Sequence, residues 1–85
     1  LKLIKEAPDT PAYYIKLGQL YTKQKRYHDV VILYQKALEA IPNSNDIKIA
    51  LGFAYLAKGE LNVAENLFEI VLKNDPDNAE AMVGL

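Results

Sequence analysis

Few side chains of this chain could support catalysis. Ser44 is the one serine of the 85 residues and His28 is the one histidine. Ser44 follows a proline-asparagine pair, where Ser44 or Asn45 is expected to cap a helix. Asp29 is next to His28 in sequence, so the two would not share a helix face. We therefore expect Ser44 to serve the fold and His28 to be solvated, and we predict no catalytic residue.

Spacings typical of disulfide, calcium or phosphate sites are also missing. The chain has no cysteine, which excludes disulfides and thiolate metal sites. The run Asp75-Pro76-Asp77 is similar to the opening of a calcium loop but lacks the later glycine and glutamate. Gly52 and Gly59 do not have the spacing of a phosphate-binding loop. The sequence therefore predicts no metal and no cofactor.

Lys23, Lys25 and Arg26 form a small basic cluster, which we expect to be a solvated helix end. No aromatic residues are interleaved with it to stack on bases. The net charge of −1 gives no field that would attract nucleic acid or anionic lipid. No apolar run approaches the roughly 20 residues that cross a bilayer. We predict no nucleic-acid partner and no membrane insertion, and the compartment stays undetermined, with a slight preference for the cytoplasm.

These residues are positioned by a sequence that repeats every 34 residues. The stretch from Tyr14 reads Y-I-K-L-G-Q-L-Y, and the stretch from Lys48 reads K-I-A-L-G-F-A-Y. Pro8, Pro42 and Pro76 keep the same spacing. A fixed period of this size indicates a stacked repeat protein, in which each unit buries its apolar face against its neighbours.

Apolar residues within each repeat recur at the spacing of two amphipathic helices. Residues Leu1–Ala7 give half a helix that ends before Pro8. About 12–15 residues are already marginal for a helix in water, so this half helix must dock on the repeat that comes after it. Complete helices are expected at residues 11–24, 27–40, 46–58 and 61–74, and a further one begins at residue 79.

The sequence also predicts how the helices begin and end and where two of them pack closely. Thr10 precedes Pro11 and can accept from the free N–H groups of the first turn. Gly59 is the expected left-handed stop of the third complete helix, whereas the first repeat has Lys25 at the matching position. Gly18 and Gly52 are each about 1 kcal/mol worse than alanine in a helix. We therefore expect a neighbouring helix to approach them too closely for a Cβ.

The pattern resembles the tetratricopeptide repeat over the whole chain. Its positions are an aromatic residue, Leu-Gly and Tyr in the first helix, Ala and Phe in the second, and a Pro after it. The first copy consists of Tyr14, Leu17, Gly18, Tyr21, Val30, Tyr34 and Pro42; the second of Leu51, Gly52, Tyr55, Ala64, Phe68 and Pro76; the third begins with Met82 and Leu85. Lys48 and Met82 depart from the pattern at the aromatic position. Val30 replaces a small alanine, which we expect to open the first helix pair slightly.

The resemblance implies an all-α, right-handed superhelical solenoid of antiparallel helix pairs. We assign residues 1–85 to a single domain of such repeats. The end of a preceding repeat covers residues 1–8, repeat one covers 11–44, repeat two covers 45–78, and the start of a further repeat covers 79–85.

The first helices of tetratricopeptide arrays line a concave groove that usually binds an extended peptide or a helix of a partner protein. The resemblance thus implies a protein–protein interaction scaffold. The groove-facing residues of the first repeat are mostly polar and basic, whereas those of the second are apolar after Asp46. The predicted partner-binding residues are Ile15, Lys16, Gln19, Lys23, Ile49, Ala50, Phe53 and Leu56.

Two roles are expected within this set. Ile49, Phe53 and Leu56 are the apolar anchors, and Lys16, Gln19 and Lys23 set the orientation of the partner. Packing against adjacent first helices would cover the same apolar residues, and the two explanations are compatible. The clamp that holds a C-terminal carboxylate in chaperone-binding members of the family is not expected, because only Gln19 is similar at the matching positions Ile15, Gln19, Ala50, Glu80 and Gly84.

Two alternatives to a peptide-binding scaffold stay open. Apolar residues near both ends of the chain could support self-association through open repeat ends. These are Leu1, Leu3 and Ile4 at one end and Met82, Val83 and Leu85 at the other. The segment could also be the adaptor region of a larger enzyme, such as a glycosyltransferase, whose chemistry lies outside these residues.

Overall fold

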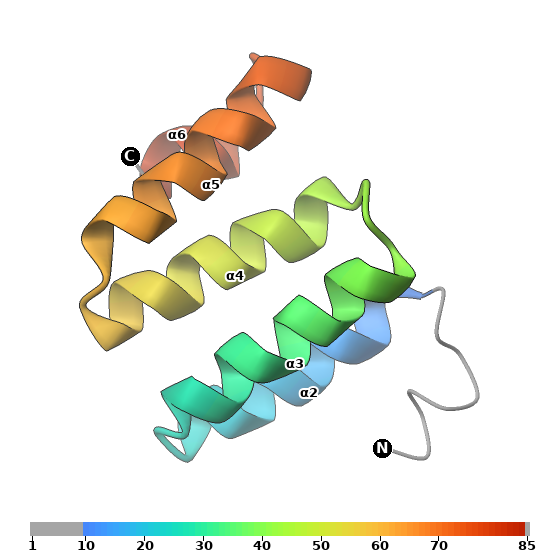
Figure 1. Ribbon diagram of the computed structural model, residues 1–85, viewed down its shortest axis with the longest axis vertical. Helices are drawn as coiled ribbons and strands as arrows, with labels where there is room; N and C mark the ends of the chain where they lie inside the picture. Colours follow the sequence, from blue (N-terminus) through green and yellow to red (C-terminus); the bar gives the residue numbers. More distant parts are fainter. Residues whose placement is uncertain (1–9, 85) are drawn as a thin grey trace.

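The computed structural model of the chain describes residues 10–84, and these form five α-helices. Each helix packs against the next one along the chain, in the antiparallel pairs α2–α3 and α4–α5 (Figure 1). The all-α stack of helix pairs is thus confirmed, while the half helix expected at residues 1–7 lies outside the described residues. The helices are α2 Pro11–Lys23, α3 Tyr27–Ala40, α4 Asn45–Lys58, α5 Leu61–Asn74 and α6 Ala79–Gly84.

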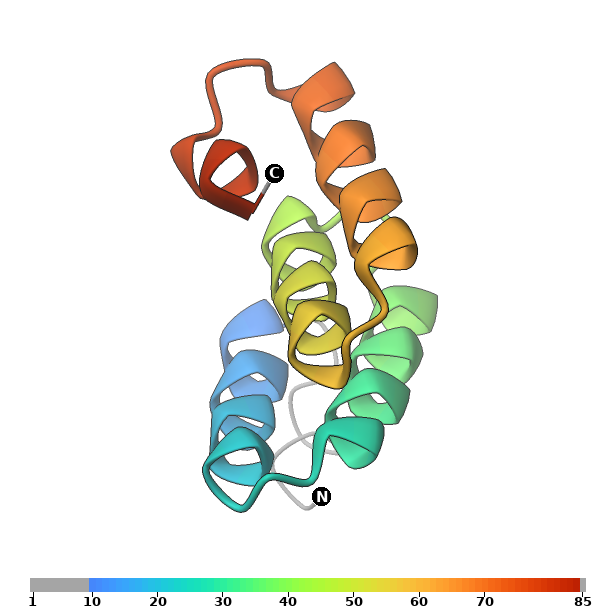
Figure 2. The same ribbon diagram turned by 90° about the vertical axis from the view of Figure 1, so that its left-hand side faces the viewer.

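The helices lie in two layers. Figure 2 shows α2, α4 and α6 on one side of the molecule and α3 and α5 on the other. The first helices also contact one another, α2 with α4 and α4 with α6. One face of the stack is therefore built from first helices alone, which is the arrangement that the repeat predicts. None of the described helices is long and apolar enough to cross a membrane.

The helix starts differ in how they are capped. Ser44 Oγ accepts a hydrogen bond of 3.2 Å from Ile47 N at the start of α4, as expected. Asn78 Oδ1 accepts a bond of 3.0 Å from Ala81 N at the start of α6. Thr10 stands at the N-cap of α2, but its side chain makes no capping hydrogen bond, contrary to expectation. Pro11 follows it and has no N–H, so one free donor of that first turn is already removed.

The turns between paired helices use a left-handed residue in both repeats. Gly59 ends α4 with φ of 86°, which confirms its predicted role. Lys25 takes the same place after α2 with φ of 60°. A side chain is unfavourable in this region, so the lysine is held there by the rest of the turn.

The core consists of two clusters that meet in α4. The first surrounds Tyr34 and includes Val30 and Ile47, while the second surrounds Phe68 and includes Val71. Val31 of α3 is also buried.

The two helix glycines make room for aromatic rings of these clusters. A Cβ on Gly18 would overlap the Tyr34 ring, and one on Gly52 would lie 2.7 Å from Phe68 Cζ. The close approach predicted for both glycines is confirmed, and the group that approaches is an aromatic side chain of the paired helix. Phe68 also lies against Gly84 of α6, so its ring is enclosed on two sides.

Candidate functional site

A groove of about 370 Å³ runs along the layer of first helices. Helices α2 and α4 form its walls, and α3 contributes buried side chains to its floor. Glu80, the second residue of α6, lines one end. The lining residues are Ile15, Gln19 and Thr22 of α2, Val30 and Tyr34 of α3, Asp46, Ile49, Ala50, Phe53, Ala54 and Ala57 of α4, and Glu80.

Phe53 is the large apolar side chain that the groove leaves in contact with solvent. It is 39% exposed. The rest of its ring packs edge-on against Phe68, with 5.1 Å between ring centroids and 63° between ring planes. This contact with a fully buried ring fixes the direction in which Phe53 faces the groove.

The other two predicted anchors are less accessible. Ile49 lines the groove but is only 3% exposed, because it packs with Phe68 and Ala81 in the second core cluster. The expectation that Ile49 offers free apolar surface is therefore wrong. Leu56 is half-buried against the same cluster and is not among the residues that line the groove. Packing against α5 and α6, rather than a partner, covers most of these two side chains.

The predicted polar residues divide in the same way. Gln19 lines the groove, together with Ile15 and Ala50. Lys16 lines a second, adjoining hollow that Asp46 also borders. Lys23, at the end of α2, lines neither. The charged side chains that line the main groove are thus acidic, and of the two predicted basic residues only Lys16 borders the adjoining hollow.

Tyr34, a position of the repeat pattern that was not among the predicted partner-binding residues, also lines the groove. Its hydroxyl donates a hydrogen bond of 3.4 Å to the carbonyl oxygen of Ile15, and its burial raises the pKa of the hydroxyl to about 12. The ring lies over Gly18, where no side chain separates α3 from the groove. The sequence signal that could have revealed this role is the spacing of sixteen residues between Gly18 in the first helix and the aromatic Tyr34 in the second.

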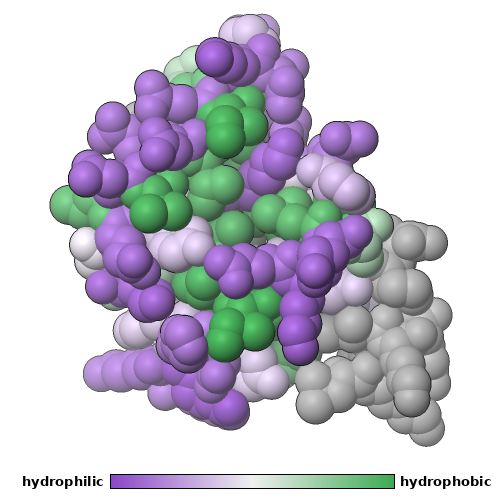
Figure 3. Space-filling view, in the orientation of Figure 1, coloured by the Kyte–Doolittle hydropathy of each residue, from purple (hydrophilic) through white to green (hydrophobic). Residues whose placement is uncertain are grey.

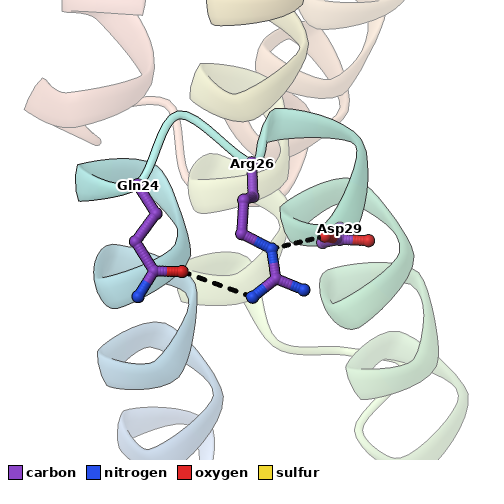
Figure 4. A network of polar contacts seen from close by, with 3 residues as sticks. All are labelled: Gln24, Arg26 and Asp29. Atoms are coloured by element: carbon purple, nitrogen blue, oxygen red, sulfur yellow. Dashed lines mark hydrogen bonds and ion pairs between the residues drawn. The ribbon is translucent and has the colours of Figure 1, made fainter.

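Arg26 is the member of the basic cluster that makes local side-chain contacts. Figure 4 shows Arg26 between Gln24 and Asp29: its Nε donates to Asp29 Oδ2 at 2.8 Å and its Nη1 to Gln24 Oε1 at 3.3 Å. The guanidinium also lies 4.6 Å from the centre of the Tyr21 ring. These contacts hold the α2–α3 turn, and all three basic residues of the cluster are exposed, as expected for a solvated helix end.

The opposite layer carries exposed apolar residues of a different kind. Figure 3 shows the face formed by α3 and α5, where green apolar patches lie among purple hydrophilic side chains. The large exposed residues of these two helices are Ile32, Leu61, Val63 and Ile70. Val63 is 40% exposed, nearly the same as Phe53, yet it lines neither hollow. It therefore serves as a matched reference for an apolar side chain outside the groove.

Metal binding has no support within residues 10–84. No group of three or more His, Asp or Glu side chains in this part of the chain could hold an ion. His28 is exposed, and Ser44 caps α4 as described.

Comparisons with known proteins agree with the repeat pattern. A profile of the tetratricopeptide repeat matches residues 21–85. The chain is 30% identical over 80 residues to the Protein CTR9 homolog of Arabidopsis thaliana and 37% identical over 67 residues to Tetratricopeptide repeat protein 14 of Mus musculus. It is 31% identical over 68 residues to Protein O-mannosyl-transferase tmtc2 of Xenopus laevis. These matches cover 93%, 79% and 76% of this chain but only 7%, 9% and 8% of the relatives.

Proposed function

The chain belongs to the tetratricopeptide repeat family, and we propose that it binds a segment of a partner protein in the groove between α2 and α4 without catalysis. Repeats of this family generally mediate protein–protein interaction and are typically non-catalytic scaffolds. What we propose beyond this general role is that the groove between α2 and α4 is the binding site.

Phe53, which is 39% exposed in the groove and packs against Phe68, is the observation that carries the proposal. An aromatic side chain buries about 150–250 Å² when it is fully covered. Covering the exposed 39% of Phe53 would remove roughly 60–100 Å² from water, which contributes about 2 kcal/mol at 25 cal/mol per Å². Its contact with Phe68 means that little side-chain entropy is lost on binding.

Polar groups beside Phe53 can orient an extended backbone. Gln19 has both a donor and an acceptor, and its side chain makes no hydrogen bond with the described residues. The Thr22 hydroxyl already donates to the carbonyl oxygen of Gly18 at 2.8 Å, which leaves its oxygen as an acceptor. Lys16 borders the adjoining hollow and would contact a segment that extends past the groove. Ile15 and Ala50 complete the apolar lining.

Site-specific photo-crosslinking in the full-length protein tests the proposal. A photoreactive benzoylphenylalanine would replace Phe53 or Gln19 in the groove and, in matched controls, Val63 or Ile32 on the opposite layer. We expect partner adducts from the two groove positions and not from the two controls. Equal adducts from Val63, or none from the groove positions of correctly folded protein, would refute the proposal.

A second candidate function is the adaptor region of a larger enzyme. One comparison favours it, because the Xenopus laevis relative is named an O-mannosyl-transferase and this chain matches only 8% of it. In that case the groove would hold a protein substrate or subunit for chemistry carried by another domain. A full-length sequence without a catalytic domain would remove this candidate.

A further inference from the structure

The charged side chains that line the main groove are both acidic. Asp46 and Glu80 are exposed at its edge. Neither forms an ion pair or a side-chain hydrogen bond with any described residue. The groove therefore joins an apolar surface around Phe53 to two carboxylates that have no partner within residues 10–84.

A role in helix stability accounts for part of this arrangement. Each carboxylate belongs to the second residue of its helix, where a negative charge favours the helix N-terminus. That role does not require the two residues to share one hollow. The stacking of α4 beside α6 places both carboxylates along the same groove. The matching residue of α2 is Ala12, so this helix forms without an acidic residue in its first turn.

Lys16 is a basic residue near the groove whose positive charge could offset the carboxylates of Asp46 and Glu80. It lines the adjoining hollow with Asp46, but the two form no ion pair. Glu80 does not line that hollow. The two charged side chains that line the main groove are thus both negative, which disfavours phosphates and carboxylates and favours a cation.

We propose that the groove selects a partner segment with a lysine or arginine about three residues from a large apolar side chain. Phe53 follows Asp46 by seven residues, which is about 10 Å along α4 at 1.5 Å per residue. An extended chain covers that distance in about three residues at 3.3 Å each. The apolar side chain covers Phe53 while the cation meets Asp46 and Glu80. This inference rests on the proposed function and specifies the chemistry of the occupant.

The expected effect of the carboxylates is moderate. Each exposed ion pair contributes little to binding, so removing both carboxylate charges should lower the affinity of the groove for a cationic peptide about 3- to 10-fold. The affinity should also fall as salt rises from about 0.05 M to about 0.5 M, because exposed charges are screened over this range. The apolar contact with Phe53 should not depend on salt in this way.

Selection of random peptides displayed on phage tests the inference. The targets are the wild-type chain, the double variant Asp46→Asn/Glu80→Gln, the control Glu65→Gln/Glu69→Gln, and Phe53→Ala. Glu65 and Glu69 are exposed on α5 outside the groove, so the control makes the same change in net charge. Circular dichroism establishes that each target is folded, and the affinities of the selected peptides are then measured at low and high salt.

The outcomes separate this inference from the function on which it rests. We expect wild type and the α5 control to enrich peptides with the proposed spacing, and the groove double variant to keep the apolar preference but lose the cation. Acidic or uncharged peptides that depend on Phe53 would overturn the cation proposal and leave the groove as a binding site. Peptides that bind Phe53→Ala as well as wild type would overturn both. A dimer in solution that Phe53→Ala converts to a monomer would identify a second copy of this chain as the occupant and overturn the cation proposal.

Discussion

The turn between α2 and α3 and the turn between α4 and α5 follow the same backbone path with different residues. Lys25 N donates to the carbonyl oxygen of Thr22 at 2.9 Å, and Gly59 N donates to that of Leu56 at 3.0 Å. The second turn uses glycine, which tolerates a positive φ. The first holds a lysine there and adds the Arg26 contacts with Asp29, Gln24 and Tyr21. The glycine turn also has a side-chain contact, an ion pair of 3.2 Å between Lys58 Nζ and Glu60 Oε2. The two repeats therefore reach one backbone geometry with glycine in one case and with a left-handed lysine in the other.

The two aromatic residues that lie over the helix glycines also differ between the repeats. Phe68 is fully buried between Gly52 and Gly84. Tyr34 has the matching position in the first pair, but its ring lines the groove and its hydroxyl reaches the carbonyl oxygen of Ile15. The second pair thus uses its ring for stability, while the first pair adds a groove surface. Four predictions, in order of expected size, test this comparison.

The largest effects are expected for the glycines beneath the two rings. Gly18→Ala and Gly52→Ala should each destabilise the protein by about 3 kcal/mol, because the new Cβ would overlap the buried ring of Tyr34 or lie 2.7 Å from Cζ of the buried Phe68. Urea unfolding monitored by circular dichroism measures both. A much smaller loss for Gly18→Ala would mean that the groove beside Tyr34 lets its ring shift.

The helix caps provide the next comparison. Ser44→Ala should cost about 1 kcal/mol, because it removes the acceptor for Ile47 N. Thr10→Ala should change stability by less than about 0.5 kcal/mol, since its side chain makes no capping bond. Thermal unfolding of both variants is the measurement. A loss at Thr10 as large as that at Ser44 would show that α2 is capped in solution.

The turn residues should respond in opposite directions. Lys25→Gly should stabilise the protein by about 0.5–1 kcal/mol. Glycine removes the conformational cost of a left-handed lysine, and this gain exceeds the entropy that glycine adds to the unfolded chain. Gly59→Ala should destabilise it by about 1 kcal/mol for the same conformational reason. The denaturant concentration at the midpoint of unfolding, compared among proteins whose m-values are equal, measures both changes in stability. No gain from Lys25→Gly would indicate that the turn imposes no strain on the lysine.

Alkaline pH should affect the first pair through Tyr34. Burial raises the pKa of its hydroxyl from 10.0 to about 12, so the folded state holds the proton more tightly than the unfolded state. This contribution is fully present below pH 10 and is lost as the pH rises toward about 12. Tyr34→Phe should lose less stability over that window than wild type, by urea unfolding at each pH. An identical decline in both proteins would contradict the assigned shift.

Most of the fold could be predicted from the sequence, because the 34-residue period links each local signal to its copies. The bounds of α3 and α5, the stop at Gly59 and the cap at Ser44 agree with the structure. The absence of a Thr10 cap was not predictable in the same way, because the residue type alone does not fix whether the hydroxyl meets the N–H groups of the first turn.

The site was less predictable, because a helix face is shared among several neighbours. Ile49 lies on the groove side of α4, yet Phe68 of α5 and Ala81 of α6 cover it, and only the packing of these two helices reveals this. Lys16 and Lys23 lie on the same side of α2, but neither lines the main groove. Phe53 and Gln19 line the groove and are exposed there, although the Phe53 ring also packs against Phe68.

The most direct test of the groove as a binding site is the dissociation constant of a crosslinked partner for wild type, Phe53→Ala and Val63→Ala. The two replaced residues are almost equally exposed, at 39% and 40%, on opposite layers. With helicity unchanged, Phe53→Ala should weaken binding at least about tenfold, which corresponds to about 1.4 kcal/mol, while Val63→Ala should stay within about twofold. An unchanged affinity for folded Phe53→Ala, or a larger loss for Val63→Ala, would contradict the account.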